Sequence, residues 1–508
     1  MKISLKTTGI PAIAMFASCT GTSEKQPEQP NIIIIMADDL GYGDLSWLGA
    51  TTIETPNVNR LANEGVRFVN CYSTSATSTP SRYGMLTGMY PWRKEGTGIA
   101  AGDAPMLILP EQYTMADMFK SAGYSTGAVG KWHLGLGGER GKQDWNGLVT
   151  PNLTDIGFDY SYIMAATGDR VPCVYIENGK VVNLDPNDPI EVSYTAPFEG
   201  EPTALNHPEL LTLHPSQGHD QSIIRGIPRI GYMKGGKSAL WKDEEIADNI
   251  TRKASEFIVR HHNQPFFLYF GTHDIHVPRV PHPRFKGLSG MGDRGDAILS
   301  FDYCVGRILD IVDSLGIADN TIILLTSDNG PVVDDGYHDK AKELLGNHKP
   351  AADLRAGKYS IFEAGTKVPC IIRWPQGMNK PGSINPGLMS QIDFFASFAS
   401  FANAAIPENA APDSRKLDKL MKNKTKKGAP FIIQQNLNST LSIVKDEWKY
   451  IEPSQAEPIE FWTKTELGNN PNPQLYNLSK DPGEINNLSA IQPEKRTELK
   501  ELLEKAKK

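Results

Sequence analysis

Three continuous runs of apolar residues predict the central strands of the fold. They lie within residues 31–44, 264–278 and 321–331, and the first contains four consecutive isoleucines. Such runs are typical of strands buried on both faces of a parallel sheet. Helical spacing of apolar residues falls between them, at 55–66 and 242–262. Strands that alternate with helices predict an α/β fold with a large, doubly wound sheet flanked by helices.

Polar side chains follow each of these predicted strands. In chain order they are Asp38 and Asp39, then His273 and His276, then Asp328 and Asn329. Ligands of open α/β sheets bind beyond the carboxyl ends of the strands. We therefore expect the chemistry of this chain at that edge of the sheet.

Two segments interrupt the alternating pattern. Residues 183–229 are rich in proline and weakly periodic, and long irregular loops of this kind tend to shape substrate pockets. Residues 414–430 are strongly basic and are expected to form a surface connection. Short apolar stretches and a charged helix from Pro493 follow. We expect a main domain over residues 31–413 and a smaller unit over residues 430–508.

Composition excludes some classes of function. The chain has 508 residues, 39% of them hydrophobic and 22% charged, which are ordinary globular values. Its net charge of −7 argues against nucleic acid as a partner, because nucleic-acid binding usually demands a basic face. A site for an anion must then be locally basic.

The N-terminus reads as an export signal followed by a tether, together residues 1–30. Lys2 and Lys6 precede a short apolar core over residues 10–17, too short to form a transmembrane helix. Residues 16–19 resemble a bacterial lipobox that ends in Cys19, with Phe16 in place of the usual leucine. We expect an exported protein, either periplasmic or anchored to a membrane by a lipid on Cys19. Simple secretion, or a disordered leader with an incidental cysteine, are the alternatives.

The segment Ser-Thr-Pro-Ser-Arg-Tyr-Gly-Met-Leu-Thr-Gly at residues 78–88 resembles the signature of the type I sulfatases, in the alkaline phosphatase superfamily. The resemblance implies that Ser78 is oxidised to formylglycine, with Pro80 and Arg82 guiding the modification. A serine at this position resembles the branch that a radical maturation enzyme modifies in anaerobic bacteria. The alternative interpretation is a polar turn that begins a helix.

The same resemblance implies one calcium ion per chain. Asp38, Asp39, Asp328 and Asn329 offer only oxygen ligands, which suit a hard cation better than zinc. In the family pattern the modified Ser78 completes the ligand set and Arg82 balances its charge. For the two aspartates at 38 and 39, helix capping after a strand is the alternative.

Basic residues of the family pattern also have counterparts in this chain. Lys131 and His133 lie in the segment Gly-Lys-Trp-His-Leu-Gly, which implies a sulfate ligand and a base. His276 precedes Val277 and Pro278, as in the family's His-X-Pro motif, which implies protonation of the leaving group. His273 either lines the sulfate pocket or hydrogen-bonds the loop.

Lys358 matches the family less closely. It lies five residues before Glu363, as in the family's corresponding segment, but Phe362 and Ala364 depart from that segment. The resemblance implies that Lys358 binds sulfate. A solvated surface lysine is the alternative, because lysine is rarely buried.

The family's mechanism is the hydrolysis of a sulfate ester. It implies that a hydroxyl of hydrated formylglycine at Ser78 attacks sulfur, with Asp328 as base, to form a covalent sulfo-enzyme intermediate. Lys131, Lys358 and Arg82 would offset the charge of the transferring group. His133 would then remove the proton of the second hydroxyl so that sulfate leaves.

A sulfated carbohydrate of a host or algal glycan is the substrate that the resemblance to exported bacterial sulfatases implies. Loop residues that could bind the sugar are Thr167, Asp169, Arg170, Asn347, His348 and Arg355. An aspartate beside an arginine suits sugar hydroxyls, although exposed pairs of this kind are often only solvated.

Two other functions are consistent with parts of the pattern. A phosphoesterase of the same superfamily would use unmodified Ser78 with two zinc ions, but such sites usually have histidine where this chain has Asn329. A catalytically inactive glycan-binding lipoprotein would require a broken catalytic set, whereas every residue of the set is present.

The resemblance also implies that the C-terminal unit is an antiparallel sheet packed with a helix.

Overall fold

The computed structural model describes residues 29–508. The predicted export signal and Cys19 lie outside these residues. Within the described part of the chain, no helix has the length and apolar character needed to cross a membrane.

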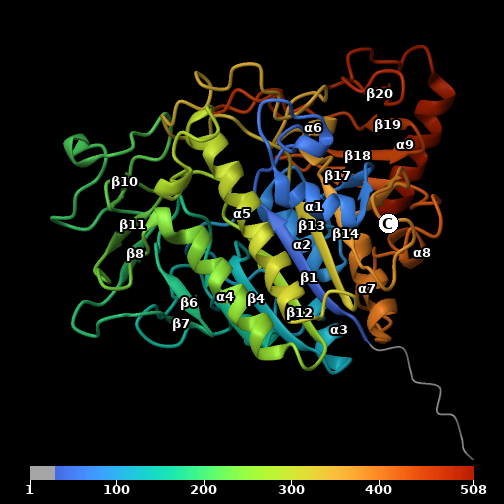
Figure 1. Cartoon of the computed structure of the whole chain (residues 1–508). Helices are drawn as coiled ribbons and strands as arrows, with labels where there is room; N and C mark the ends of the chain where they lie inside the picture. Colours follow the sequence, from blue (N-terminus) through green and yellow to red (C-terminus); the bar gives the residue numbers. More distant parts are fainter. Residues whose placement is uncertain (1–28) are drawn as a thin grey trace, which may run out of the picture.

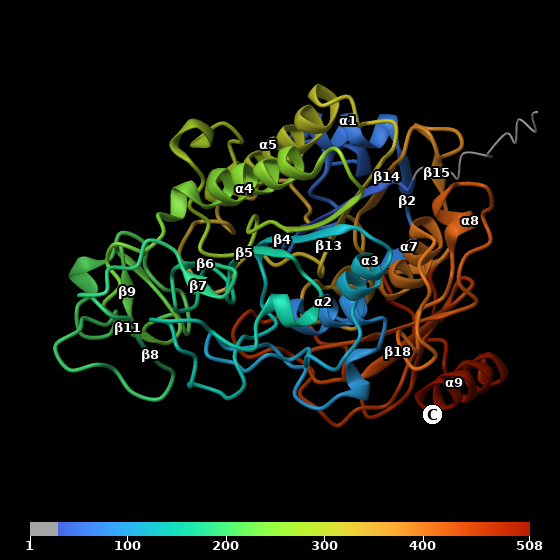
Figure 2. The same ribbon diagram turned by 90° about the horizontal axis from the view of Figure 1, so that it is seen from below.

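A ten-stranded mixed sheet forms the centre of the molecule (Figures 1 and 2). From edge to edge its strands are β15 (Ile384–Asn385), β2 (Val66–Phe68), β14 (Cys370–Arg373), β13 (Thr321–Ser327), β1 (Asn31–Ala37), β12 (Phe266–Gly271), β4 (Ser125–Lys131), β5 (Tyr160–Met164), β6 (Tyr175–Glu177) and β7 (Lys180–Val181). The five strands from β13 to β5 are parallel, and antiparallel pairs flank them on both sides.

Helices cover both faces of this sheet, as Figure 2 shows. On one face lie α1 (Pro56–Glu64), α4 (Ile246–His261) and α5 (Gly292–Ser314), and on the other α2 (Ser78–Thr87), α3 (Met115–Ser121) and α7 (Phe394–Ala402). Every residue of β1, β12 and β13 is consequently buried. This explains why their sequences are continuous apolar runs rather than alternating ones.

The register of the central strands places the functional residues. Ala37 at the end of β1 pairs with Ser327 at the end of β13. Asp38 and Asp328, the next residues along the two strands, therefore emerge side by side at the carboxyl edge. The sequence pattern had placed both residues at this edge.

Shorter elements form the periphery. Beyond β7 the interrupting segment and the residues that follow it form two small antiparallel ribbons, coloured green in Figure 1. They pair β8 (Glu191–Ser193) with β11 (Tyr232–Lys234) and β9 (Ile223–Ile224) with β10 (Ile227–Pro228). Elsewhere β3 (Cys71–Tyr72) pairs with β16 (Met389–Ser390), and two single-turn helices are α6 (Glu363–Thr366) and α8 (Asp418–Met421).

The C-terminal unit is a separate four-stranded antiparallel sheet. Its strands, in order, are β17 (Ile432–Gln435), β18 (Leu441–Lys445), β19 (Trp448–Ile451) and β20 (Gln474–Asn477). The last helix, α9 (Pro493–Lys507), packs on β18 and β19. The predicted fold, a large mixed α/β sheet with a smaller antiparallel sheet and helix, is confirmed.

A buried ion cluster joins the two sheets. The Lys449 ammonium on β19 lies 3.1 Å from Glu363 of α6 and 3.0 Å from Glu484. Glu363 also accepts a hydrogen bond of 2.6 Å from the hydroxyl of Tyr72. Burial raises the pKa of Glu484 to about 7, even though Lys449 opposes the shift. Lys449 thus serves two carboxylates that have no access to water, and Lys367 lies 3.8 Å from Glu363 as a second, more distant cation.

Replacing Lys449 by methionine should strongly destabilise the protein. The substitution removes the nearest cation from both buried carboxylates and leaves Glu363 with only the more distant Lys367, and breaking a buried ion pair in this way costs about 3–5 kcal/mol. The free energy of unfolding in urea measures the loss. Lys445→Met is the matched control, because Lys445 pairs with Glu498 at the surface and its loss should cost under about 1 kcal/mol. Equal losses for the two variants would contradict this account of the cluster.

Candidate active site

Ser78 is the first residue of α2 and lies at the carboxyl edge of the sheet. Its hydroxyl is 3.3 Å from the amide oxygen of Asn329 and 3.3 Å from the ammonium of Lys131. The free N–H groups and the dipole of a helix N-terminus favour negative charge. Ser78 is therefore positioned beside an environment that suits an anion.

The acidic residues form one connected group behind Ser78. Asp38 and Asp39 follow β1, Asp328 and Asn329 follow β13, and all four are fully buried. Asn329 donates a hydrogen bond of 2.7 Å to Asp39, and the backbone N–H of Asp39 lies 3.3 Å from the Asp328 carboxylate. The structure thus brings together the four residues predicted as metal ligands.

Three buried cations balance these carboxylates. Arg82 on α2 donates two hydrogen bonds to Asp328, of 3.0 and 2.7 Å, and a third of 2.6 Å to the hydroxyl of Tyr269. Lys131, at the end of β4, is hydrogen-bonded to Asp38. Burial alone would raise the pKa of Asp328, but the Arg82 guanidinium lowers it to about 2.

Lys358 reaches the same group from the segment before α6. Its ammonium lies 2.9 Å from Asp39 and 2.8 Å from Asp335, and the side chain is 5% exposed. Burial opposes a charge here, but Asp335 and Asp39 hold the pKa of Lys358 well above its usual value. The alternative of a solvated surface lysine is therefore wrong.

The acidic group fits a divalent metal ion. One carboxylate oxygen of Asp38 is buried without a hydrogen-bond partner among the described residues. Burial, followed by the charge of Asp328, raises the pKa of Asp38 well above its usual value. Ligand atoms of Asp38, Asp39 and His276 lie within 4.8 Å of one another. An unpartnered buried oxygen among converging carboxylates is what a hard cation would satisfy.

The set that includes His276 differs from the predicted all-oxygen set. Asp328 is turned toward Arg82, whereas Nε2 of His276 lies 3.9 Å from Asp39. Nδ1 of His276 donates to the carbonyl of its neighbour Val277 at 2.6 Å, so Nε2 of the neutral ring carries the lone pair. This nitrogen is suited either to a metal ion or to proton exchange.

His133 is held in the opposite tautomer. Nε2 lies 3.0 Å from the carbonyl oxygen of Ala100, which only accepts hydrogen bonds, so Nε2 bears the proton. Nδ1 is buried and has no partner among the described residues, which leaves its lone pair free. Burial and then Lys131 hold the pKa of His133 well below its usual value. The ring is thus a neutral proton acceptor.

These groups surround a cavity of about 60 Å³. The side chains that line it are Thr77, Ser78, Ile99, His133, Asp169, Arg170, His219, His276, Asp335, Lys358 and Tyr359. Thr167 lies behind the lining, hydrogen-bonded to Asp169 and, at 2.9 Å, to Arg170. A small, polar space of this kind can hold one compact anionic group.

Sequence reasoning missed several residues of this cavity. His219 comes from the interrupting segment at 183–229, which had been predicted to shape a substrate pocket without any residue being named. Its Nε2 lies 2.9 Å from the Asp169 carboxylate. Asp335 pairs with Lys358 and accepts a hydrogen bond of 2.9 Å from Tyr359. Outside the cavity wall, Tyr269, which accepts a hydrogen bond from Arg82, was also missed because inside a predicted strand it is indistinguishable from a core aromatic residue.

Other predicted substrate residues do not reach the cavity. Asn347 and His348 line a separate surface hollow, and His348 is hydrogen-bonded to the buried Asp44 at 2.7 Å. Arg355 forms an ion pair of 2.6 Å with Glu466. His273 packs against Gly168, where a Cβ atom would lie 2.2 Å from the imidazole. None of these four residues lines the cavity at Ser78.

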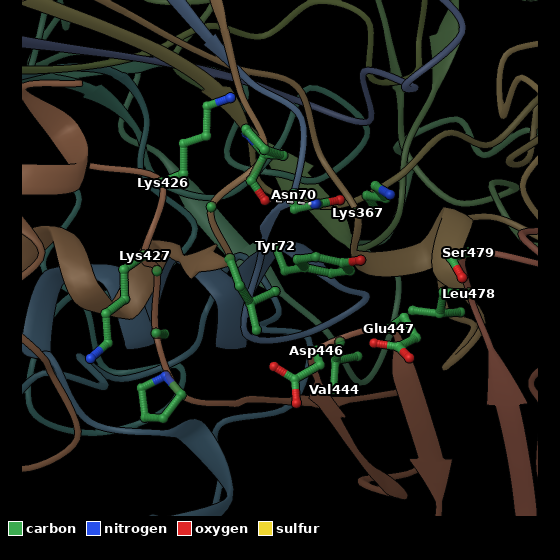
Figure 3. Close-up of a pocket in the computed structure, with 16 residues that line it drawn as sticks. Asn70, Tyr72, Lys367, Lys426, Lys427, Val444, Asp446, Glu447, Leu478 and Ser479 are labelled. Atoms are coloured by element: carbon green, nitrogen blue, oxygen red, sulfur yellow. Dashed lines mark hydrogen bonds between the residues drawn. The ribbon is translucent and has the colours of Figure 1, made fainter. Parts of the chain in front are cut away.

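A larger cavity lies elsewhere (Figure 3). It has a volume of about 500 Å³ and opens between the main sheet and the C-terminal unit. Tyr72, Lys367, Lys426 and Asp446 are among its lining residues, and none of them lines the cavity at Ser78. Of these two cavities the smaller one alone has histidines in its wall, His133, His219 and His276, and it is the better candidate for chemistry.

Comparison with known proteins agrees with this geometry. The sequence profile of the sulfatase family matches residues 30–404. The chain belongs to the sulfatase family. Sulfatases are sulfuric ester hydrolases, and the cavity of this sulfatase has Ser78 at a helix N-terminus, Lys358 in its wall, and Lys131 and Arg82 directly behind.

Relatives of this sulfatase include enzymes named as sulfatases. The chain is 57% identical over 502 residues to an N-acetylgalactosamine-6-O-sulfatase of Bacteroides thetaiotaomicron, covering 98% of each chain. It is 30% identical to the steryl-sulfatase of Mus musculus, covering 90% of this chain and 78% of the relative.

Solved structures give the same result. A structure from work on glycosaminoglycan metabolism by Bacteroides thetaiotaomicron has a TM-score of 0.93 and 58% identity, covering 94% of this chain and 99% of that one. A sulfatase from Pseudoalteromonas sp. has a TM-score of 0.68 and 21% identity, over 95% and 90% of the two chains. This more distant structure is similar in fold alone.

Replacing His219 by alanine should lower the kcat/KM of this sulfatase. The imidazole is one of the groups that fix the Asp169 carboxylate in the cavity wall. Losing a hydrogen bond to a charged group costs about 1.5–3 kcal/mol, which corresponds to roughly tenfold to a hundredfold in rate. Sulfate release measures the change. His207→Ala, an exposed histidine of the same segment, is the control and should leave activity unaltered.

Proposed function

We propose that this sulfatase hydrolyses the 6-sulfate ester of an N-acetylgalactosamine residue in a sulfated glycan. The identity shared over nearly the whole chain with the Bacteroides thetaiotaomicron enzyme of that name carries the proposal. The cavity supports it, because it has room for a sulfate group and its wall holds His133 and His276 together with Lys358 and Arg170.

We propose further that Ser78 is the site of formylglycine. When formed, the hydrated aldehyde would supply one hydroxyl to attack sulfur and a second whose deprotonation releases sulfate. The position of Ser78 at the start of α2, within reach of Asn329 and Lys131, supports this assignment. Lys131 and the helix N-terminus would stabilise negative charge that develops at residue 78.

A calcium ion is the metal we propose for the acidic group. When bound, it would polarise the sulfate oxygens and strengthen the positive field around them. Asp38, Asp39, Asp328 and Asn329 would hold it through oxygen atoms, the ligands that calcium prefers. Counting Asp335, four carboxylates face three cations in this region, so a further positive charge would improve the balance.

The two histidines divide the proton transfers. Nδ1 of His133 has the free lone pair needed to accept a proton from residue 78. Burial and then Lys358 hold the pKa of His276 well below its usual value. A bound sulfate ester would add negative charge nearby and raise that pKa, so that Nε2 gains the proton it donates to the departing sugar hydroxyl. Lys131, Lys358 and Arg82 would offset the charge of the transferring group.

Export and maturation complete the proposal. We propose that the protein is exported, and anchored through Cys19, in an anaerobic bacterium whose radical maturation enzyme modifies Ser78. The lysine-containing leader, the lipobox-like residues 16–19 and the serine at position 78 support this. An active preparation should therefore be made together with such a maturation enzyme.

The protein should release sulfate from N-acetylgalactosamine-6-sulfate and not from the 4-sulfated sugar. The cavity admits only a compact anion. The 6-sulfate lies outside the sugar ring and can enter alone, whereas the 4-sulfate is attached at a ring carbon and could enter only together with the ring. Sulfate released from each sugar, and phosphate released from the corresponding phosphate ester, give the comparison. Turnover of the phosphate ester alone would overturn the proposed function.

Ser78→Ala supplies the control for that assay. The variant should release no sulfate while its thermal unfolding stays close to that of the unsubstituted protein. Mass spectrometry of the active preparation should show that residue 78 has the mass of serine less two hydrogen atoms. Full activity in a preparation with unmodified serine would refute the formylglycine assignment.

Calcium should raise the thermal stability of protein treated with a chelator. Ligand at a hundred times its dissociation constant stabilises by about 2.7 kcal/mol, which amounts to a few degrees in a protein of this size. Asp39→Asn should abolish the calcium-dependent rise. Asp302→Asn is the control, since this buried aspartate accepts from the N–H groups of Asn57 and Val58, away from the site. Stabilisation by zinc but not by calcium would contradict the proposed metal.

A further inference from the structure

A short hairpin projects from the C-terminal unit between β19 and β20. Ile459 and Glu466 pair across it, and its tip is tied internally. The Glu460 carboxylate accepts hydrogen bonds from the backbone N–H groups of Trp462, at 2.8 Å, and Thr463, at 2.5 Å. The hydroxyl of Thr463 donates to the same carboxylate at 2.8 Å. The tip is therefore fixed by its own side chains rather than free to rearrange.

This ordered tip displays two large aromatic rings to solvent. Phe461 is 69% exposed and Trp462 is 52% exposed. The rings contact each other edge to face, with centroids 4.8 Å apart. Exposed aromatic residues that lie together on a hydrogen-bonded backbone are typical of binding surfaces. Burying them against a partner is favourable, and little conformational entropy is lost when they bind.

The tip lies at the rim of the Ser78 cavity. The position that a Cβ atom of Gly218 would take is 3.9 Å from the indole of Trp462, and the next residue, His219, lines the cavity. On its other side the hairpin shares a surface hollow with Asp334 and Gly357. Their neighbours in sequence, Asp335 and Lys358, also line the cavity. Thus His219, Asp335 and Lys358, which line the cavity, are each one position in the sequence away from a residue that lies beside the hairpin.

An ion pair holds the base of the hairpin in this place. The Arg355 guanidinium makes two hydrogen bonds to Glu466, of 2.9 and 2.6 Å. It also stacks 3.9 Å from the ring centroid of Phe362. Arg355 is three residues before Lys358, so the hairpin is fastened to the segment that carries a cavity lysine. Arg355 thereby acts on the rim rather than inside the cavity.

Because the cavity is small, most of a glycan substrate must lie outside it, against the rim. Its 60 Å³ can hold a few water-sized groups, enough for a sulfate but not for a hexosamine ring. The sugar that carries the sulfate must extend outward, and any sugar linked to it must lie further out. The neighbouring sugar would then meet the rim, where the hairpin is one of the walls.

We propose that the hairpin tip, with Trp462 foremost, is a platform for the sugar residue linked to the sulfated one. This inference rests on the proposed function. One face of a sugar ring presents C–H groups that pack on an aromatic ring, while its hydroxyls stay in water. The Lys464 ammonium, 4.8 Å from the centroid of Phe461 and without an ion-pair partner in residues 29–508, suits an acidic sugar at this position.

Trp462→Ala should raise the KM for a long substrate and leave the KM for a short one nearly unchanged. On a trisaccharide with an acidic sugar next to a 6-sulfated terminal residue, KM should rise about tenfold with kcat retained, since roughly 1.4 kcal/mol of contact is lost. On the 6-sulfated monosaccharide, KM and kcat should stay within about twofold, because the platform makes no contact with this substrate. Trp462→Tyr should restore most of the affinity for the trisaccharide.

Ile491→Ala is the control, because Ile491 is 71% exposed and lies just before α9. It should change neither substrate. Equal effects of Trp462→Ala on both substrates, or no effect on either, would overturn the platform. If the unsubstituted protein releases sulfate from neither substrate, the proposed function has failed. Calorimetric titration with the desulfated trisaccharide then tests the platform separately. The platform predicts that Trp462→Ala binds this trisaccharide more weakly than the unsubstituted protein does, and equal binding would refute it.

Discussion

The parallel pairing of β1 and β13 is the constraint on which the rest of the site depends. It brings Asp38, Asp39 and Asp328 to one point without water, where carboxylates repel one another and pay the full cost of burial. Such a cluster is tolerable only if cations come to it. Arg82, Lys131 and Lys358 arrive from a helix, a strand and a loop, so charge balance ties three distant segments to the same sheet edge.

Much of this arrangement could be predicted because it follows local patterns. Continuous apolar runs predicted strands buried on both faces, and the polar residues after them could emerge only at one edge of a parallel sheet. Lys358 shows the limit of that reasoning. Taken alone, its sequence context favoured a solvated side chain. Its burial follows from Asp39 and Asp335, which pair with it only after the fold is formed.

The parts that escaped prediction depend on contacts between irregular segments. His219 and Asp335 lie in loops without periodicity, and nothing in their neighbouring residues distinguishes them from solvated groups. His348 and Arg355 had the right chemistry for a sugar, but Asp44 and Glu466 already bind them. These partners are separated from them by 304 and 111 positions, a range over which single-sequence patterns carry no information.

The ion cluster at Lys449 bears on what counts as a domain in this protein. By sequence the chain divides near residues 413–430, and by topology the four-stranded sheet is separate. Energetically the division does not hold, because Glu363, five residues after Lys358, has its nearest cation on the other sheet. Melting of the C-terminal sheet would remove Lys449 from Glu363 and leave this carboxylate with only the more distant Lys367. The two sheets are therefore expected to unfold in one cooperative transition, and the smaller one is a structural part of the active site.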